Sequence, residues 1–482
     1  MVAIEIILFA VAILLIISVL ASKISTKLSV PALLIFLFIG MLAGSEGIGG
    51  MYFDDPLAAQ SLGVVALIFI LFSGGLDTPF TEIRPILGRG VLLSTVGVLI
   101  TALVVAGFVM ILLDYAPAEA FLVGAIVAAT DAAAVFSILR TQKIGLKGRT
   151  IPLLELESGS NDPMAIFLTI SAIELVLHPD TSFINLMLIF IQQMGLGILL
   201  GLLIGYLTSR AINKLRLEAD GLYPVFMIGV VLLTYSLTTT LGGSGFLAVY
   251  LVGLVMSGRN FIHKNSLSRF HDALSWLMQI ILFLSLGLLV FPSQLLPIAV
   301  TGVLIAIILI FVARPLSVFI VLMFSQFDVR DKLMISWVGL RGATPIVMAT
   351  FPLLEGIPQS DVIFNIIFFV VLVSVLLQGS TLIAVAKLLN ITVPLAQKPQ
   401  YPFDLVTDRD IRNGLIEIPV HADSPAINRQ IVNLGLPDES LIVLISRGQE
   451  IIVPNGNTII EDGDVLLVLA DKESLVKIKG CI

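Results

Sequence analysis

The sequence predicts an all-α polytopic membrane protein with thirteen transmembrane helices, followed by a small α+β cytoplasmic domain. Of the 482 residues, 57% are hydrophobic and only 13% are charged, against about 25% charged residues in a typical soluble domain. Thirteen apolar stretches approach the length, about 20 residues, at which a helix crosses a bilayer. After residue 390 the composition changes to that of ordinary soluble sequence.

The same numbers exclude several other classes of protein. The single cysteine, Cys481, excludes a disulfide framework and a cysteine metal cluster. The net charge of -7 leaves no basic field for nucleic acid. The first apolar stretch has neither a positively charged start nor a small-residue cleavage site, so we interpret it as a retained helix and not as a signal peptide.

The predicted spans follow one another closely along the chain. A window of about 20 apolar residues places them at residues 2–21, 29–45, 60–76, 90–113, 119–139, 151–177, 183–209, 221–240, 244–258, 273–291, 296–324, 333–352 and 362–388.

Basic residues between the spans predict the orientation, because Lys and Arg near span ends collect on the cytoplasmic side. Loops after odd-numbered spans hold sixteen Lys and Arg residues, and the opposite loops hold none. We therefore expect a multi-pass protein of the bacterial cytoplasmic membrane, with its N-terminus outside and its C-terminus in the cytoplasm.

Two short matches predict an inverted internal repeat. "FIGMLAG" resembles "LVGLVMSG" and "LFSGGL" resembles "LFLSLGL". The matches pair Gly40 with Gly253 and Gly75 with Gly287, at nearly the same offset. That offset equals seven spans, an odd number, so the second copy lies upside down in the membrane.

The same offset relates two helices that we expect to be broken. "AATDAAAVF" puts Thr130 and Asp131 in the middle of the fifth span, and "GLRGATP" puts Arg341, Gly342 and Pro345 in the twelfth. Glycine and proline release backbone hydrogen bonds, which in lipid must be satisfied by protein, water or an ion. Two broken, crossing helices at matching positions of an inverted repeat indicate an ion site near the middle of the membrane.

Charged residues inside the predicted spans each cost about 2.5 to 3.5 kcal/mol on insertion scales. In "LESGSNDPMAIFLT", a spacing of four residues puts Glu157 beside Asn161 and Ser158 beside Asp162 on one helix face. Four carboxylates face two arginines, so at least one carboxylate must bind a proton or a mobile cation to become neutral. The six charged residues that lie furthest from the span ends are Asp131, Glu155, Glu157, Asp162, Arg314 and Arg341.

The two arginines also allow a purely structural interpretation. Arg314 and Arg341 can form ion pairs that hold the bundle together, with Glu157 and Asp77 as candidate partners. Asp77 can equally be an interfacial residue.

For Asp162 we expect a competition in which the carboxylate binds a proton or a dehydrated alkali cation, never both. The hydroxyls of Thr130 and Ser158 and the freed backbone carbonyls are hard oxygen ligands that suit such an ion. Because either ligand neutralises the site, only the loaded forms cross the membrane interior at low cost, and strict exchange follows. We expect no metal beyond the transported alkali cation and no cofactor in this unit.

These motifs resemble the monovalent cation/proton antiporters of the NhaP and Na+/H+ exchanger branch. "ATDAAAVF" is similar to that family's broken fifth helix, "ESGSNDP" to its Asn-Asp helix, "ARPLSVF" to its arginine helix and "GLRGATPIVMA" to its second broken helix. The resemblance covers residues 1 to about 390 and implies a homodimer.

The resemblance also implies roles for individual residues. Asp162 corresponds to the essential ion and proton carboxylate, and Asn161 before it goes with electroneutral, one-for-one exchange. Ala132 stands where the family usually has proline, which leaves the detailed shape of the crossing open. Cation and proton binding is implied for Asp162, Thr130, Ser158 and Asp131, with support from Asn161, Glu157, its ion-pair partner Arg314, the structural Arg341, and Asp77.

The sequence after the last span predicts a linker and a separate domain. Three prolines within residues 391–402 are typical of a linker, which separates a transmembrane domain at 1–390 from a cytoplasmic domain at 403–482. In that domain we expect strands in "GLIEIPV", "SLIVLISRGQEIIVPNG" and "DVLLVLA". "SPAINRQIVNLGL" predicts a helix capped by Ser424, and "DKESLVKIKG" a closing helix.

This order of elements resembles the C-terminal subdomain of regulator-of-potassium-conductance proteins, the RCK_C or TrkA_C type. The resemblance implies dimerisation and a small regulatory ligand, such as a cyclic dinucleotide. A passive dimerisation module is the alternative. A glycine-rich dinucleotide-binding segment does not precede the domain, so the NAD-binding half of many such proteins is not expected.

Together these features predict an electroneutral antiporter and not an enzyme. We expect it to exchange K+ for H+ under control of its C-terminal domain, with Na+ as the second candidate substrate. One alternative is a Na+(Li+)/H+ antiporter with a passive dimerising tail. Another is a ligand-gated K+ channel, but the "TVG" at residues 95–97 continues inside a long span and does not resemble a selectivity filter. The expected partners are membrane lipid, a second copy of the chain and a small nucleotide.

Overall fold

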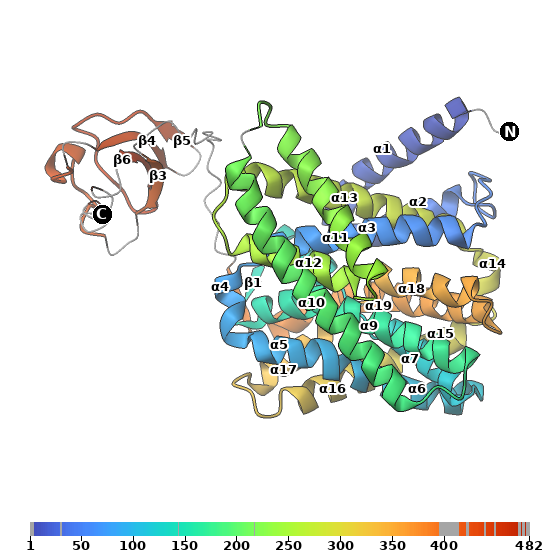
Figure 1. Cartoon of the computed structure of the whole chain (residues 1–482). Coiled ribbons are helices and arrows are strands. Elements are labelled where there is room, and N and C mark those ends of the chain that lie inside the picture. Colours follow the sequence, from blue (N-terminus) through green and yellow to red (C-terminus); the bar gives the residue numbers. More distant parts are fainter. Residues whose placement is uncertain are drawn as a thin grey trace. The chain divides into compact units, whose positions relative to one another are not determined.

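The computed structural model divides into two compact units, Met1–Leu395 and Ala396–Ile482 (Figure 1). The structure describes residues 4–28, 31–142, 144–215, 217–394, 414–420, 424–437, 440–447, 450–470, 474 and 478.

Unit 1 is a bundle of helices. Among its described residues, nine helical segments are long and apolar enough to cross a membrane, and four shorter apolar helices lie between them. The nine are α1 (Ile4–Leu28), α3 (Pro56–Asp77), Phe80–Leu113, α9 (Thr150–Leu177), α10 (Phe183–Lys214), α11 (Leu222–Thr240), α13 (Lys264–Leu289), Ala299–Val321 and α19 (Ser360–Leu388). The four are α2 (Ala32–Ala43), α7 (Pro117–Val127), α12 (Gly245–Ser257) and α18 (Ala343–Leu354).

Each predicted span coincides with helical structure, while the crossing of the membrane by all thirteen stays a prediction. Two predicted spans begin too late: the fourth extends back to Phe80, and the tenth begins at Lys264 instead of 273. Hydropathy marks only the apolar part of a helix, whereas backbone hydrogen bonding continues through polar turns.

Glycine contacts support the inverted repeat. Gly40 of α2 packs on Gly287 of α13, and a Cβ added at Gly40 would lie 3.0 Å from the Gly287 Cα atom. Gly75 of α3 packs on Gly253 of α12 in the same way, at 3.3 Å from the Gly253 Cα atom. In the predicted repeat, Gly40 corresponds to Gly253 and Gly287 corresponds to Gly75, so the two contacts are equivalent. Small residues permit such close backbone approach between membrane helices.

Two of the long helical segments contain a π-helical turn. Phe80–Leu113 comprises α4 (Phe80–Ile83), η1 (Arg84–Ile86), α5 (Leu87–Leu92), the π-helical η2 (Leu93–Gly97) and α6 (Val98–Leu113). Ala299–Val321 comprises α15 (Ala299–Ile308), the π-helical η3 (Leu309–Ala313) and α16 (Arg314–Val321), and follows the short α14 (Pro292–Leu295). Such turns occur frequently at functional sites, and here the second one ends immediately before Arg314.

Both helices predicted to be broken are broken. α7 ends at Val127 and α8 (Ala132–Thr141) begins after a short non-helical stretch, while α17 (Val329–Trp337) and α18 are separated in the same way. The two interruptions touch, because the backbone N–H of Asp131 donates to the carbonyl of Leu340 at 2.7 Å.

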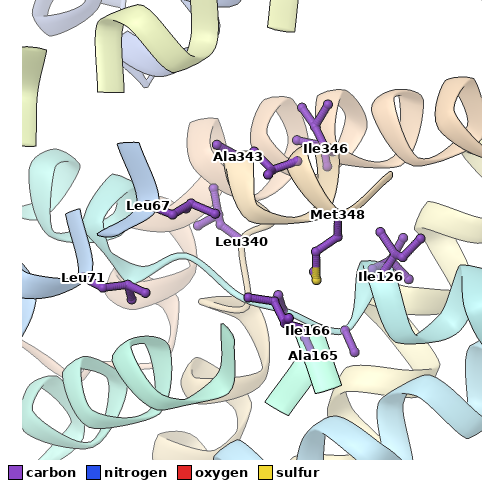
Figure 2. Close-up of a cluster of buried hydrophobic side chains, with 14 of the residues drawn as sticks. Leu67, Leu71, Ile126, Ala165, Ile166, Leu340, Ala343, Ile346 and Met348 are labelled. Carbon is purple, nitrogen blue, oxygen red and sulfur yellow. The ribbon is translucent and has the colours of Figure 1, made fainter. Parts of the chain in front are cut away.

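Apolar side chains from four helices and one of the interruptions pack around this crossing, as Figure 2 shows. The labelled residues are Leu67 and Leu71 of α3, Ile126 of α7, Ala165 and Ile166 of α9, Leu340 of the second interruption, and Ala343, Ile346 and Met348 of α18.

A small two-stranded sheet joins two distant parts of unit 1. β1 (Ile144–Leu146), between α8 and α9, pairs antiparallel with β2 (Thr392–Pro394), which follows α19. The Lys147 N–H extends the ladder by donating to the Ile391 carbonyl at 2.9 Å. The predicted linker therefore does not begin at 391, because these residues are ordered by pairing with β1. Its remainder, from 395, lies outside the described residues.

Unit 2 contains an antiparallel sheet in the order β3-β6-β4-β5 around its own apolar core. The strands are β3 (Gly414–Pro419), β4 (Leu441–Arg447), β5 (Glu450–Ile452) and β6 (Val465–Ala470). Arg447 holds the end of β4 by donating from Nε and Nη2 to the buried Asp464, each at 2.8 Å.

The predicted helix in "SPAINRQIVNLGL" is wrong. This segment forms turns and one short 3-10 helix, η4 (Ile431–Asn433). Besides the bonds within its own turns, its backbone pairs with the stretch before β6: Asn428 N–H donates to Ile460 O at 2.8 Å, and Ile460 N–H donates to Arg429 O at 3.0 Å. Ser424 accepts from Ala426 N–H at 3.2 Å and so caps a turn. Most of the predicted closing helix lies outside the described residues.

Candidate functional site

The candidate site is centred on α9, which is continuous although it contains Pro163. Glu157, Asn161 and Asp162 are all at least 93% buried, so the polar face predicted from their spacing points into the protein and not into lipid. Ser158 is partly buried beside them.

Side chains of α9 satisfy the backbone of the first interruption. Asn161 Nδ2 donates to the Thr130 hydroxyl and to the Thr130 carbonyl, the latter at 3.3 Å. Ser158 Oγ donates to the same carbonyl at 3.2 Å and accepts from the Ala132 N–H, the first residue of α8, at 2.9 Å. Asn161 Oδ1 is buried and has no hydrogen-bond partner. Thr130, Ser158 and Asn161 are therefore brought together.

Asp162 connects α9 to the second broken helix. The Thr344 hydroxyl, in the first turn of α18, donates to Asp162 Oδ2 at 2.9 Å, and both residues are 7% exposed. Asp131 lies against Gly342, because a Cβ added at Gly342 would collide with the Asp131 carboxylate. Gly342 is the N-cap of α18, so the Asp131 charge faces the positive end of that helix.

Arg314 forms the predicted ion pair with Glu157. Its two terminal nitrogens bind the two carboxylate oxygens, with Nη2 at 2.8 Å from Oε2, and both side chains are buried. Nη2 also donates to the Ile335 carbonyl, in the last turn of α17, at 3.3 Å. Glu157 is thus neutralised by a bidentate pair.

Arg341 has a different environment from the one predicted. Its Nη1 donates to the carbonyls of Ala128 and Ala129, at 2.6 and 2.7 Å, where α7 ends. Its Nε and Nη2 atoms are buried without hydrogen-bond partners. Asp77, the other residue considered for an ion pair, ends α3 and accepts from Ser268 of α13 at 2.8 Å.

Three polar residues near the crossing were not predicted. Besides Thr344, these are Ser374 and Gln378 of α19. Ser374 Oγ accepts from the Arg341 N–H at 3.2 Å, and Gln378 Nε2 donates to the Trp337 carbonyl at 2.8 Å. Both are fully buried. Ser374 and Gln378 are four residues apart in an otherwise apolar helix, so the sequence places them on one helix face and could have predicted a polar contact there.

The arrangement leaves Asp162 with a neutral hydrogen-bond partner, whereas Glu157 has a fixed cation. Oxygen atoms of Thr130, Ser158 and Asp162 lie on the facing segments, and oxygen donors suit a hard monovalent cation. Within the part of the chain that the structure describes, no group of three or more His, Cys, Asp or Glu side chains could hold another metal ion.

Comparison with known families matches both units. Residues 11–388 match the family described as "Sodium/hydrogen exchanger, transmembrane", and residues 415–479 match the TrkA-C domain.

Two relatives are similar over nearly the whole chain. The K(+)/H(+) antiporter NhaP2 of Shewanella sp. (strain ANA-3) is 40% identical over 95% of this chain and 80% of that protein. The K(+)/H(+) antiporter NhaP of Alkalimonas amylolytica is 37% identical over 97% of this chain and 81% of that protein.

A solved structure is similar to this chain over most of its length. The sodium proton antiporter MjNhaP1 from Methanocaldococcus jannaschii, solved at pH 8, superposes with a TM-score of 0.69 and 27% identity. The match covers 80% of this chain and 99% of that one. It supports the mainly helical fold described above.

Proposed function

We propose, from the premise that this chain belongs to the sodium/hydrogen exchanger family, that it exchanges K+ for H+ electroneutrally across the bacterial cytoplasmic membrane. The family resemblance read from the motifs is confirmed. The protein is a multi-pass membrane protein and a secondary transporter, not an enzyme. Na+ is the second candidate substrate.

One observation carries the proposal: the buried Asp162 carboxylate has a neutral hydroxyl as its hydrogen-bond partner. A buried charge without a fixed counter-ion is unfavourable, so the carboxylate must be neutralised by a mobile cation. A proton and one monovalent alkali ion each supply a single positive charge. One-for-one exchange follows because both loaded forms carry the same net charge.

Two findings favour K+ over Na+. The relatives that match nearly the whole chain are named as K+/H+ antiporters, and the tail matches the TrkA-C domain. A Na+(Li+)/H+ antiporter with a passive tail remains the alternative, and a comparison of K+, Na+, Rb+ and Li+ distinguishes the two.

In this proposal the tail regulates exchange by binding a small nucleotide such as a cyclic dinucleotide. The protein works as a homodimer, and its tail lies in the cytoplasm. The β1–β2 ladder supports this regulation. β2 is the last described segment before the tail, and β1 directly follows α8, the second half of the first broken helix. In this proposal β2 links the chain that continues into the tail to β1, and through β1 to α8.

The test is Asp162→Asn in proteoliposomes that hold a preset pH gradient. Addition of K+ should dissipate the gradient with the native protein, and the variant should reduce the rate to the level of empty vesicles, because an amide cannot exchange a proton for a cation. Asp114→Asn is the matched control: Asp114 is exposed with φ 54°, and Asn tolerates that conformation equally well.

The variant's elution profile and thermal unfolding should remain native. Retained exchange by folded Asp162→Asn would defeat the site assignment. The native exchange rate should be the same at different clamped membrane potentials. If each cycle moved one net charge, its free energy would change by about 2.3 kcal/mol per 100 mV, and the rate would depend on the potential. A K+ current without a pH requirement would instead indicate a channel.

A further inference from the structure

We propose that Thr344 is a positioning residue of the exchange site, whose hydroxyl holds the Asp162 carboxylate and sets the balance between proton and alkali cation. This inference rests on the proposed function, in which Asp162 binds either ion. It gives the second broken helix a direct part in the site, through a side chain of α18 that contacts Asp162.

The geometry places Thr344 where it can act on Asp162 alone. It is the second residue of α18, and its Oγ1 lies 2.9 Å from Asp162 Oδ2. Both side chains are buried. Bulk water therefore does not substitute readily for the hydroxyl if it is removed.

A hydroxyl can serve both loaded forms of the carboxylate. When Asp162 is ionised, Thr344 donates to it, and hydrogen bonds to the charged form favour that form over the protonated one. When Asp162 is protonated, the same hydroxyl can rotate and accept the carboxyl O–H. Thr344 thereby weakens proton binding, and it fixes one carboxylate oxygen while the other stays free to meet a cation.

Other charged groups lie near the crossing of the two interruptions and remain in every variant of Thr344. They are Asp131 at the first interruption, the Glu157–Arg314 pair between α9 and α16, and Arg341 at the second interruption. A shift seen on changing Thr344 is thus attributable to its hydroxyl.

The chain provides a matched control on the same helix. Thr350 is also buried in α18, but its hydroxyl donates to the Val347 carbonyl at 2.6 Å, within its own helix. Thr350→Val removes a buried hydroxyl from α18 without removing a bond to Asp162. The variants Thr344→Val and Thr344→Ala remove the hydroxyl at the site, and Thr344→Ser retains it.

The experiment measures exchange by the full-length variants in proteoliposomes against pH and K+ concentration. Thr344→Val should raise the pH of half-maximal exchange by about one unit, because a hydrogen bond to a charged group is lost. Near neutral pH the KM for K+ should rise about tenfold, while the maximal rate at alkaline pH stays close to native. Thr344→Ser and Thr350→Val should keep the native pH profile.

Two results would overturn the inference: a native pH profile and KM in Thr344→Val, or an equal defect in Thr344→Ser, which would assign the effect to packing. If Thr344→Val does not fold, Thr344→Ala gives the same comparison. Asp162→Asn is assayed in parallel. Loss of exchange in Asp162→Asn together with unchanged Thr344→Val rejects only the role of Thr344, whereas exchange by Asp162→Asn rejects the proposed function itself.

Discussion

Arg314 and Arg341 are both buried, and each donates to backbone carbonyls at the end of a half-helix. Arg341 binds the end of α7, and Arg314 binds the Ile335 carbonyl of α17. The last carbonyls of a helix carry a partial negative charge and lack intrahelical partners. The two guanidinium groups therefore stabilise the interruptions in both copies of the repeat. Arg314 differs in also neutralising Glu157.

This difference predicts how removal of Arg314 affects the protein. Arg314→Ala should lower stability by about 3–5 kcal/mol, because it leaves the Glu157 carboxylate buried and unpaired. Thermal unfolding in detergent measures the loss. The double variant Arg314→Met with Glu157→Gln removes both charges and should recover much of it. A stable but inactive Arg314→Ala protein would contradict this structural role and favour a direct role in transport.

Residue patterns predicted part of the site and missed the rest for a physical reason. The pairing of Glu157 with Arg314 and the contact of Thr130 with Asn161 could be expected, because uncompensated charges and freed backbone groups in a membrane need partners. Thr344 is a single hydroxyl between Ala343 and Pro345, and hydroxyls are common in membrane helices. The sequence places it near the second interruption but does not show that its hydroxyl reaches Asp162, whereas that of Thr350 stays within its own helix.

At the scale of elements, the two broken helices were predictable and several details were not. Glycines in the sequence mark positions of close helix contact, as Gly40 does for its contact with Gly287 and Gly253 for its contact with Gly75. The π-helical turns η2 and η3, the β1–β2 ladder and the tail segment bonded to residues before β6 have no comparable mark. The β1–β2 ladder and the tail segment depend on partners far along the chain, and non-local pairing overrides local propensity.

The β1–β2 ladder allows a prediction with a built-in control. In antiparallel pairs, hydrogen-bonded and non-bonded positions alternate. The bond from Lys147 N–H to Ile391 O therefore makes Val393 a bonded position and Thr392 a non-bonded one. The natural Pro394 occupies a non-bonded position, where its missing N–H costs nothing.

Val393→Pro should consequently weaken the ladder, and Thr392→Pro should preserve it. Each lost hydrogen bond contributes about 1 kcal/mol, so amide hydrogen exchange at residues 144–147 should accelerate about fivefold or more in Val393→Pro. Mass spectrometry of the full-length protein detects this change. Equal acceleration in both variants would mean that the ladder does not follow the alternation described here.

At the scale of the whole molecule, the two units have separate apolar cores. Ile445, Leu466 and Ile460 are fully buried in the core of unit 2, and none of them belongs to the core of unit 1. Composition alone predicted this division, because a chain that is mostly apolar cannot share one core with an ordinary soluble sequence. A domain with its own core folds largely independently of its neighbour.

Deletion of residues 403–482 should therefore spare basal exchange and remove its regulation. We expect the K+/H+ exchange rate in proteoliposomes to stay within about threefold of native, since the core and the ion site of unit 1 are intact. The response to pH or to an added cyclic dinucleotide should change, because β2 no longer connects the tail to β1 and α8. Full-length Val393→Pro serves as a comparison, since it weakens the connection but keeps the tail. Complete loss of exchange on deletion would show that the tail is structural, and an unchanged response would favour a passive dimerisation module.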